Sequence, residues 1–218
     1  MRNIRPYQDD VMWIWKRFSR REYAIYSVLA GTSHVFEHRL GCWGLCLCIR
    51  SDPTYLSLDA WLHHHKPPLT SRIRVANAMA RLYKDLHAVG VYHVDIKPDH
   101  IFISETLDVR VIDFNHSVLR DRFERPWWTR PYLAPEIRSG DIDWEKWDMF
   151  VLGLVLFYVM TGREYMTGSH RLSDITRKFR SELPHGIEEV RAMVQGQECI
   201  DIGCLLEMDP KNRAFVWK

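Results

Sequence analysis

The segment from Leu86 to Asn115 restricts the fold of this chain more than any other. It places Asp95 shortly after an apolar helical pattern and Asp113 at the end of a short apolar run, so the two carboxylates can converge. Two carboxylates at one point can bind a divalent cation with a phosphate chain, or one can accept a proton while the other binds metal. Lys97 adds positive charge for a phosphoryl group. A single aspartate at a strand end is usually a cap or turn former, so the argument depends on the spacing of the set.

The elements around these residues follow from periodicity and chain breakers. Thr70, after two prolines, is a natural N-cap for a helix that ends near Gly90. The apolar stripe of this helix would consist of Ile73, Ala76, Met79, Ala80, Tyr83 and Leu86. The short apolar runs at 100–103 and 109–113 flank a turn and predict a hairpin.

The first fifty residues predict a strand, a helix and a second strand. Residues 11–15, VMWIW, are rich in β-branched and aromatic side chains, which indicates a buried strand. Residues 20–30 form a helical pattern with Gly31 as its stop, and residues 44–50, GLCLCIR, form the second strand. One face of the helix would carry Glu22, Ile25, Tyr26 and Leu29.

The second half of the chain predicts a long loop followed by helices. About 20 residues after Asp113 show no regular pattern, and a loop of that length is typically functional. From Pro135 onward the pattern is mostly helical. The apolar run from Met149 to Met160 is well short of the roughly 20 residues that span a bilayer, so it predicts a buried core helix and no membrane association.

Composition places the chain among globular proteins and argues against nucleic-acid binding. With 218 residues, 46% of them hydrophobic, it can bury one sizeable core or two small lobes. The 30 basic and 28 acidic residues are interspersed, so no basic nucleic-acid footprint is expected.

The five cysteines lack metal-ligand spacing and suit reduced thiols. With no signal or transit pattern at the N-terminus, we expect an intracellular protein, cytoplasmic or nuclear.

Five short motifs follow one another in the chain. They are His93-Val94-Asp95-Ile96-Lys97-Pro98-Asp99-His100, Asp113-Phe114-Asn115, WTRPYLAPE at 128–136, Asp148-Met149-Phe150-Val151-Leu152-Gly153 and Asp209-Pro210-Lys211-Asn212-Arg213. In this order they resemble the catalytic loop, metal motif, substrate-positioning loop, buried central helix and closing motif of eukaryotic protein kinases. Thr129 stands five residues before Ala134, as in serine/threonine kinases. Each motif is weak alone, but their ordered agreement is specific.

The resemblance implies a role for each matching residue. Asp95 would be the catalytic base that orients a substrate hydroxyl, Lys97 would contact the γ-phosphate, and Asp113 would bind the metal. The implied cofactor is ATP with Mg²⁺ or Mn²⁺. Thr129 would belong to the substrate loop. As structural residues, Asp148 would lie in the central helix, and Glu136 would form a largely buried ion pair with Arg213.

The family also has a lysine-glutamate pair that positions the α- and β-phosphates. Glu22 fits the helical partner of this pair. The lysine is ambiguous, because side chains alternate along VMWIWK: Trp13 and Lys16 point to opposite faces, and the register decides which one lies over the nucleotide. Lys16 is therefore one alternative, and a solvated lysine at a strand end is the other.

Several positions depart from the family pattern. This chain contains no Gly-x-Gly-x-x-Gly sequence and only ten residues precede Val11, so we expect the two strands and the loop that cover ATP phosphates to be absent. His100 replaces an asparagine that binds a second metal ion, and imidazole suits Mn²⁺ or Zn²⁺ better than Mg²⁺. Asn115 replaces a glycine, and asparagine tolerates a left-handed backbone. Val94 replaces an arginine that pairs with an activation-loop phosphate in many kinases.

These observations predict an α+β, protein-kinase-like fold as one domain, 1–218. It would have a reduced N-terminal lobe at 1–50, a hinge region at 51–69 and a mainly helical C-terminal lobe at 70–218. Two functions stay open: a serine/threonine-type phosphotransferase with a degenerate nucleotide site and a protein substrate, or a pseudokinase that acts by binding a protein partner. A third, a small-molecule phosphotransferase, is disfavoured by WTRPYLAPE, and the sequence leaves the oligomeric state undetermined.

Overall fold

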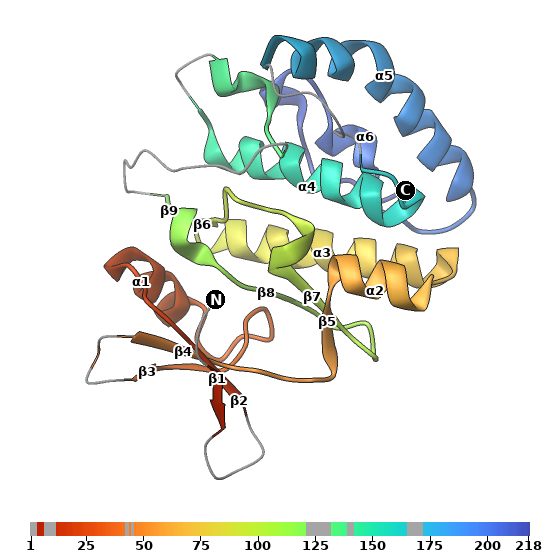
Figure 1. Ribbon diagram of the computed structural model, residues 1–218. Coiled ribbons are helices and arrows are strands. Elements are labelled where there is room, and N and C mark those ends of the chain that lie inside the picture. Colours follow the sequence, from red (N-terminus) through yellow and green to blue (C-terminus); the bar gives the residue numbers. More distant parts are fainter. Residues whose placement is uncertain are drawn as a thin grey trace.

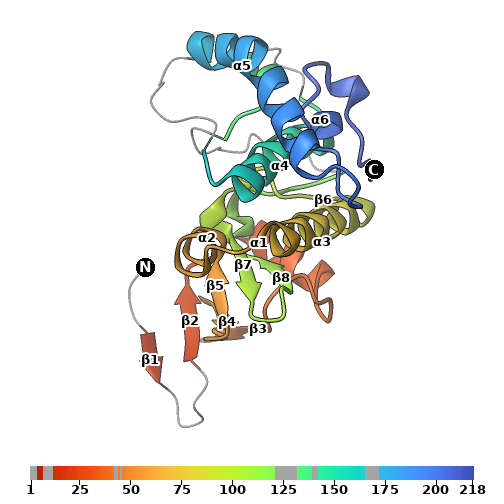
Figure 2. The same ribbon diagram turned by 90° about the vertical axis from the view of Figure 1, so that its right-hand side faces the viewer.

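The computed structural model describes residues 4–6, 12–41, 44, 46–120, 132–138, 142–164 and 172–218. They form a small lobe with a four-stranded sheet and one helix, and a larger lobe in which helices predominate (Figure 1). Both views show the same order from the small lobe outward: the sheet, α3 (Leu69–Ala88), α4 (Trp144–Thr161) and α5 (Leu172–Met193) (Figure 2). The predicted α+β fold with few strands at its start is confirmed.

The sheet of the small lobe is antiparallel, with the strand order β1-β2-β4-β3. Its strands are β1 (Ile4–Pro6), β2 (Met12–Lys16), β3 (His38–Gly41) and β4 (Cys46–Arg50). β2 and β4 correspond to the two predicted strands, but the prediction that β2 is buried is wrong, because Ile14 is 40% and Trp15 is 37% exposed. β1 and β3 were not predicted, and the expectation that the two strands before residue 11 are absent is wrong in part, because one short strand, β1, is present. β1 has only three residues and ends in proline, and β3 lacks a clear apolar alternation, so pairing with β2 and β4 decides both.

Helix α1 (Arg20–Val28) begins where its local sequence indicates. Ser19 is the N-cap, and its hydroxyl accepts a hydrogen bond from the backbone N–H of Glu22 at 3.0 Å. The helix ends at Leu29, two residues before Gly31, which has a left-handed φ of 79°. The buried face carries Glu22, Ile25 and Tyr26, as the periodicity predicts.

Residues 51–69, which follow the small-lobe sheet along the chain, contain two regular elements that belong to the larger lobe. They are β5 (Tyr55–Ser57) and α2 (Leu58–His65), and the helix ends at Lys66 in a left-handed conformation. β5 joins the predicted hairpin in a sheet with the order β5-β7-β8. The hairpin itself, β7 (Ile101–Ser104) and β8 (Val109–Val111), is antiparallel and is confirmed.

Helix α3 begins earlier than the sequence suggests, so the prediction of Thr70 as its N-cap is wrong. Pro68 occupies that position and has no side-chain cap. Its carbonyl instead accepts the backbone N–H of Ser71 at 3.0 Å and of Arg72 at 3.1 Å. The guanidinium of Arg72 also donates to the carbonyl of Pro67, which ties the residues before the helix to its first turn.

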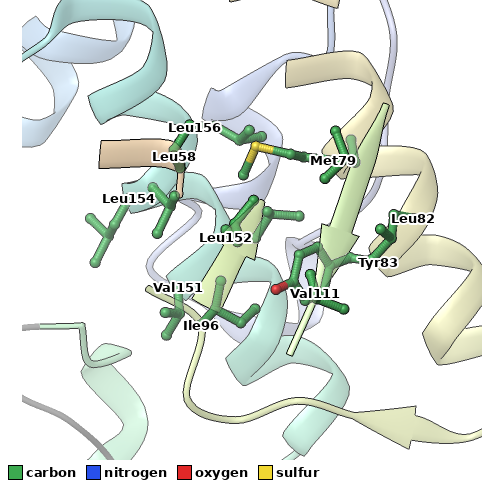
Figure 3. Close-up of a cluster of buried hydrophobic side chains, with 14 of the residues drawn as sticks. Leu58, Met79, Leu82, Tyr83, Ile96, Val111, Val151, Leu152, Leu154 and Leu156 are labelled. Atoms are coloured by element: carbon green, nitrogen blue, oxygen red, sulfur yellow. The ribbon is translucent and has the colours of Figure 1, made fainter. Parts of the chain in front are cut away.

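Helix α4 is the centre of the larger lobe. All of its residues from Trp147 to Met160 are buried, and Figure 3 shows their side chains meeting those of α3 and β8. A fully buried aliphatic side chain contributes roughly 1.5–3 kcal/mol, so this contact is a major source of stability. The apolar run is thus a core helix, as predicted. Within the described ranges, no helix is long and apolar enough to cross a membrane.

A glycine in α4 allows a close approach to helix α6 (Ile202–Leu205). A Cβ atom at Gly153 would come within 2.7 Å of the Leu206 side chain.

The remaining short elements position loops. They are β6 (Val91–Tyr92) paired with β9 (Val118–Leu119), and the 3₁₀ turns η2 (Pro98–His100), η3 (Phe114–His116), η4 (Pro135–Arg138) and η5 (Pro210–Asn212).

Candidate functional site

The loop after β6 is held by a buried carboxylate of α4. Asp148 accepts the backbone N–H of His93 at 2.6 Å and that of Val94 at 2.7 Å. Nε2 of His87 lies 3.2 Å from the same carboxylate. Because both oxygens of Asp148 are engaged in a dry interior, the loop has little freedom to move.

Val94 has a strained backbone that this anchor maintains. Its φ of 67° is an outlier for a β-branched residue. Its carbonyl accepts a hydrogen bond from Nε1 of Trp147 at 3.2 Å, so both polar groups of its backbone are bound to α4. Strain of this kind persists only where the surroundings fix it, and here it aims the next residue, Asp95.

Asp95 and Lys97 lie together at the end of this loop. Nζ of Lys97 donates to Oδ2 of Asp95 at 3.0 Å. The Asp95 side chain is only 4% exposed, whereas that of Lys97 is 19% exposed. The two residues proposed from the sequence for proton acceptance and phosphate contact are therefore adjacent.

The ambiguity between Lys16 and Trp13 is decided by the register of β2. Lys16 pairs with Leu47 of β4, and its Nζ lies 2.8 Å from Oε1 of Glu22 and 2.7 Å from Oδ1 of Asp113. Trp13 instead has the guanidinium of Arg39 4.1 Å from its ring centroid. Lys16 is thus the residue that joins α1 to the Asp113 loop.

The charges around Lys16 reinforce one another. Burial by itself lowers the pKa of Lys16, but the carboxylates of Glu22 and Asp113 outweigh burial and the net shift is upward. Burial likewise favours a higher pKa for Asp113, but the hydrogen bond from Lys16 and its positive charge reverse the shift. Asp113 is therefore an anion beside a cation at neutral pH.

Asp113 also has an unusual backbone and a second donor. Its φ is 69°, in the left-handed region. Nδ2 of Asn115 donates to Oδ1 of Asp113 at 2.9 Å, and the carbonyl of Asn115 accepts Nη2 of Arg21 at 2.7 Å. The sequence analysis did not foresee these contacts, because no spacing rule links Arg21 to Asn115.

His100 lies between the two aspartates. Its Nδ1 is 3.0 Å from the carbonyl oxygen of Asp95, and its Nε2 is 3.3 Å from Oδ2 of Asp113. Burial, His93 and Lys97 lower the pKa of His100 to about 4, so the ring is neutral near pH 7. The carbonyl of Asp95 and the carboxylate of Asp113 both only accept hydrogen bonds, so either nitrogen can carry the hydrogen of the neutral ring.

Aromatic rings connect the two lobes behind the charged residues. Phe114 lies 5.2 Å from Tyr26 of α1 and 5.1 Å from His93, measured between ring centroids. The rings of Phe114 and Tyr26 meet edge to face, and such a contact stabilises by about 0.5–1.5 kcal/mol beyond its buried area. Tyr26 was predicted to be on the buried face of its helix, but its contact with Phe114 was not.

The predicted ion pair between Glu136 and Arg213 is present. Nη1 and Nη2 of Arg213 lie 2.5 Å and 2.8 Å from Oε1 and Oε2 of Glu136. Thr129, the candidate substrate-loop residue, lies outside the described residues.

Comparisons with known proteins agree with this arrangement. The family model described as the protein kinase domain matches residues 57–216, which is most of the chain. The chain belongs to the protein kinase family. The match includes the loop with Asp95, the Asp113 motif, α4 and the Glu136–Arg213 pair, but it begins after Lys16 and Glu22.

Individual kinases match at low identity. Sperm motility kinase Z of Mus musculus is 32% identical over 58% of the chain, and mitogen-activated protein kinase HOG1 of Debaryomyces hansenii is 32% identical over 49%. Serine/threonine-protein kinase kin-29 of Caenorhabditis briggsae is 30% identical over 60%. The matches cover 25%, 29% and 16% of these relatives, so this kinase domain spans less than a third of each.

The kinase family implies a divalent metal, and the donor atoms fit one in part. Nε2 of His100 and Oδ2 of Asp113 lie 3.3 Å apart, and both are atoms that can bind a cation. Among the described residues, however, no cluster of three or more His, Cys, Asp or Glu side chains is arranged as a metal site. A metal ion at His100 and Asp113 would therefore need further oxygen ligands from phosphate or water.

A separate cavity in this kinase domain has no part in the site. It has a volume of about 670 Å³ and is lined by residues of the α1–β3 connection, the segment after β4, and Arg110. None of the lining residues is a predicted site residue. The candidate site is therefore identified by its converging charged side chains and not by this cavity.

Proposed function

We propose that this chain is an ATP-dependent protein phosphotransferase of serine/threonine type that works with a reduced nucleotide site. The observation that carries the proposal is the position of Lys16, whose Nζ contacts both Glu22 and Asp113. A structural lysine at a strand end needs neither contact. A lysine that positions phosphates needs the glutamate that holds it and must lie near the metal-binding aspartate.

Each charged residue has a distinct task in this proposal. Lys16 binds the α- and β-phosphates, and Glu22 holds Lys16 in place. Asp95 accepts the proton of the substrate hydroxyl as the oxygen attacks the γ-phosphorus, and Lys97 binds the oxygens of the transferred group. Asp95 is buried and already paired with Lys97, so its carboxylate is oriented before the substrate binds.

The proposed cofactor is ATP with Mn²⁺ or Mg²⁺. A bound metal ion would supply positive charge that neutralises the phosphates. Asp113 and His100 are the residues of this chain that would hold it. Because His100 is neutral and offers a nitrogen, we expect a preference for Mn²⁺ over Mg²⁺.

A pseudokinase that binds a protein partner is the second candidate. Two observations favour it: this chain contains no Gly-x-Gly-x-x-Gly sequence, and Oδ1 of Asp113 accepts a hydrogen bond from Asn115, at the position where the family has glycine. In this alternative, hydrogen bonds within the protein take the place of contacts with a nucleotide. The helical lobe would then supply the surface that binds the protein partner.

Thermal unfolding with nucleotide and metal separates the two candidates. A ligand at 100 times its dissociation constant stabilises the native state by about 2.7 kcal/mol. For a chain of this length that corresponds to a rise in Tm of roughly 5–10 °C. The phosphotransferase proposal predicts such a rise with ATP and Mn²⁺, and its loss in Asp113→Ala.

Transfer itself needs a second assay with wild type and Asp95→Asn. We expect the wild type to move labelled γ-phosphate to serine or threonine of a generic protein substrate, and Asp95→Asn to retain the thermal shift without transfer. No thermal shift at millimolar ATP with either metal would favour the pseudokinase and overturn the proposal.

A further inference from the structure

Asn115 makes a contact that a glycine at this position could not make. Its Nδ2 donates to Oδ1 of Asp113 at 2.9 Å. The backbone conformation does not explain why residue 115 is asparagine, because its φ is not left-handed. Within the described ranges, the non-glycine residues with a left-handed φ are Lys66, Val94, Leu107 and Asp113. The left-handed position of the motif is Asp113, so the side chain of Asn115 is what distinguishes this site.

The hydrogen bond from Asn115 makes the two oxygens of Asp113 inequivalent. Oδ1 receives Nζ of Lys16 at 2.7 Å and Nδ2 of Asn115 at 2.9 Å. Oδ2 faces Nε2 of His100 at 3.3 Å. Two donors on one oxygen thus leave the other oxygen directed toward His100, the second proposed metal ligand.

The same residue is connected to α1. Nη2 of Arg21 donates to the carbonyl oxygen of Asn115 at 2.7 Å, and the next residue, Glu22, holds Lys16 at 2.8 Å. Two successive residues of α1 are therefore linked to Oδ1 of Asp113. Glu22 is linked to it through Lys16, and Arg21 is linked to it through Asn115.

We infer that Asn115 is a positioning residue for metal-nucleotide binding: with Arg21, it holds the Asp113 carboxylate so that Oδ2 faces His100. This inference rests on the proposed function of the site. The χ2 torsion of an aspartate is broad and roughly two-fold, so an untethered carboxylate would have to be ordered when the metal binds. A preset orientation removes that cost, as in other preorganised sites.

The test measures binding of Mn²⁺·ATP and, separately, of adenosine to the full chain. Free Mn²⁺ is followed by electron paramagnetic resonance, and adenosine by calorimetry. For Asn115→Ala we expect at least roughly a tenfold rise in the Kd of Mn²⁺·ATP, the lower end for one hydrogen bond to a charged group. The Kd of adenosine should change less than twofold, because adenosine carries neither phosphate nor metal.

Asn115→Asp distinguishes a positioning residue from a metal ligand. An aspartate cannot donate to Oδ1 and repels the Asp113 carboxylate, so the inference predicts a loss at least as large as that of Asn115→Ala. A direct ligand role predicts the opposite, because a carboxylate binds Mn²⁺ better than an amide does. Tighter binding by Asn115→Asp would overturn the inference.

Arg21→Met tests the connection to α1, with Arg20→Met as the matched control. Arg20 is exposed on the same helix. We expect Arg21→Met to weaken Mn²⁺·ATP by about three- to fivefold and Arg20→Met to leave it within twofold. If the wild type binds Mn²⁺·ATP and the variants at positions 21 and 115 bind equally well, only this inference fails. A wild type that binds no Mn²⁺·ATP overturns the proposed function as well.

Discussion

The guanidinium of Arg213 and the carboxylate of Glu136 form a bidentate ion pair across 77 positions of sequence, at 2.5 Å and 2.8 Å. The Arg213 side chain is fully buried and that of Glu136 is 8% exposed. Arg213 also donates to the carbonyls of Lys146 and Glu207, so each of its nitrogens has an acceptor. The pair pins the turn at 135–138 to the helical lobe.

Loss of Arg213 should strongly destabilise the chain. Arg213→Ala removes the buried ion-pair partner of Glu136 and the donor to two carbonyls, and we expect the free energy of unfolding to fall by about 3–5 kcal/mol. Urea denaturation measures this change. Arg50→Ala is the control, because the Arg50–Glu37 pair is at least half exposed and should contribute less than about 1 kcal/mol. Equal, small effects of both substitutions would show that the buried pair is not a stabilising contact.

Asp113 and Asp95 should have separable effects on the proposed reaction. Asp113→Ala removes the partner of Lys16 and the candidate metal ligand, so we expect metal-dependent ATP binding to be lost. Asp95→Ala should keep binding within a few-fold and reduce transfer by at least about 100-fold, the usual contribution of a general base. Calorimetry and a phosphate-transfer assay report the two quantities. Full activity of Asp113→Ala at saturating ATP and metal would contradict the assignment.

The identity of residue 100 should set the preferred metal. With His100, we expect Mn²⁺ to support tighter ATP binding than Mg²⁺, because a neutral imidazole is a poor ligand for Mg²⁺. His100→Asn supplies an amide oxygen and should raise binding with Mg²⁺ relative to Mn²⁺. The exposed His64, changed to Asn, is the control. A metal profile that is the same in all three proteins would mean that His100 only packs between the aspartates.

Asp148→Asn should weaken the anchor of the loop that carries Asp95. The carboxylate accepts two backbone N–H groups at 2.6 Å and 2.7 Å, and an amide has only one oxygen to offer them. One buried N–H would face an NH₂ group, so we expect a loss of about 1–3 kcal/mol in unfolding free energy. Asp143→Asn, at the N-cap of the same helix, should change stability by less than about 0.5 kcal/mol because Asn caps as well as Asp. Comparable losses of unfolding free energy in the two variants would contradict the role of Asp148 as the anchor of this loop.

Asp201 should give stability a specific acid dependence. Burial favours a higher pKa, but hydrogen bonds from Arg191 and Lys218 outweigh it and lower the pKa to about 2, against an ordinary value of 3.8. A depressed folded-state pKa means that the unfolded chain binds the proton first as pH falls. The stabilisation is therefore complete above about pH 4 and is lost toward pH 2.

Asp201→Asn tests this dependence. It should cost about 2 kcal/mol at pH 7, and the difference from wild type should shrink as the pH falls below 4. Glu198→Gln, at an exposed carboxylate nearby, should show no such trend in urea titrations at several pH values. A difference between Asp201→Asn and wild type that is constant from pH 7 to pH 3 would contradict the prediction.

Local sequence predicted the elements whose signals are short-range. The stripe from Ile73 to Leu86 and the run from Met149 to Met160 indicated helices, and the runs at 100–103 and 109–113 indicated a hairpin. Strands β1 and β3 escaped prediction because three or four residues without alternation carry no signal. The start of α3 was misplaced because the carbonyl of Pro68, rather than a side chain, satisfies the first turn.

The sequence by itself determined the family, the ordered motifs and the residue types of the site, because these depend on spacing along the chain. It could not decide between Lys16 and Trp13, since a shift of one residue exchanges the faces of a strand. Pairing of β2 with β4 made that choice and brought Lys16 to Asp113, 97 positions away. The hydrogen bonds of Asn115 and the orientation of His100 likewise exist only in the folded chain. They depend on the tertiary packing of α1, η3 and the loop that carries Asp95. This packing brings together atoms that no local sequence pattern relates.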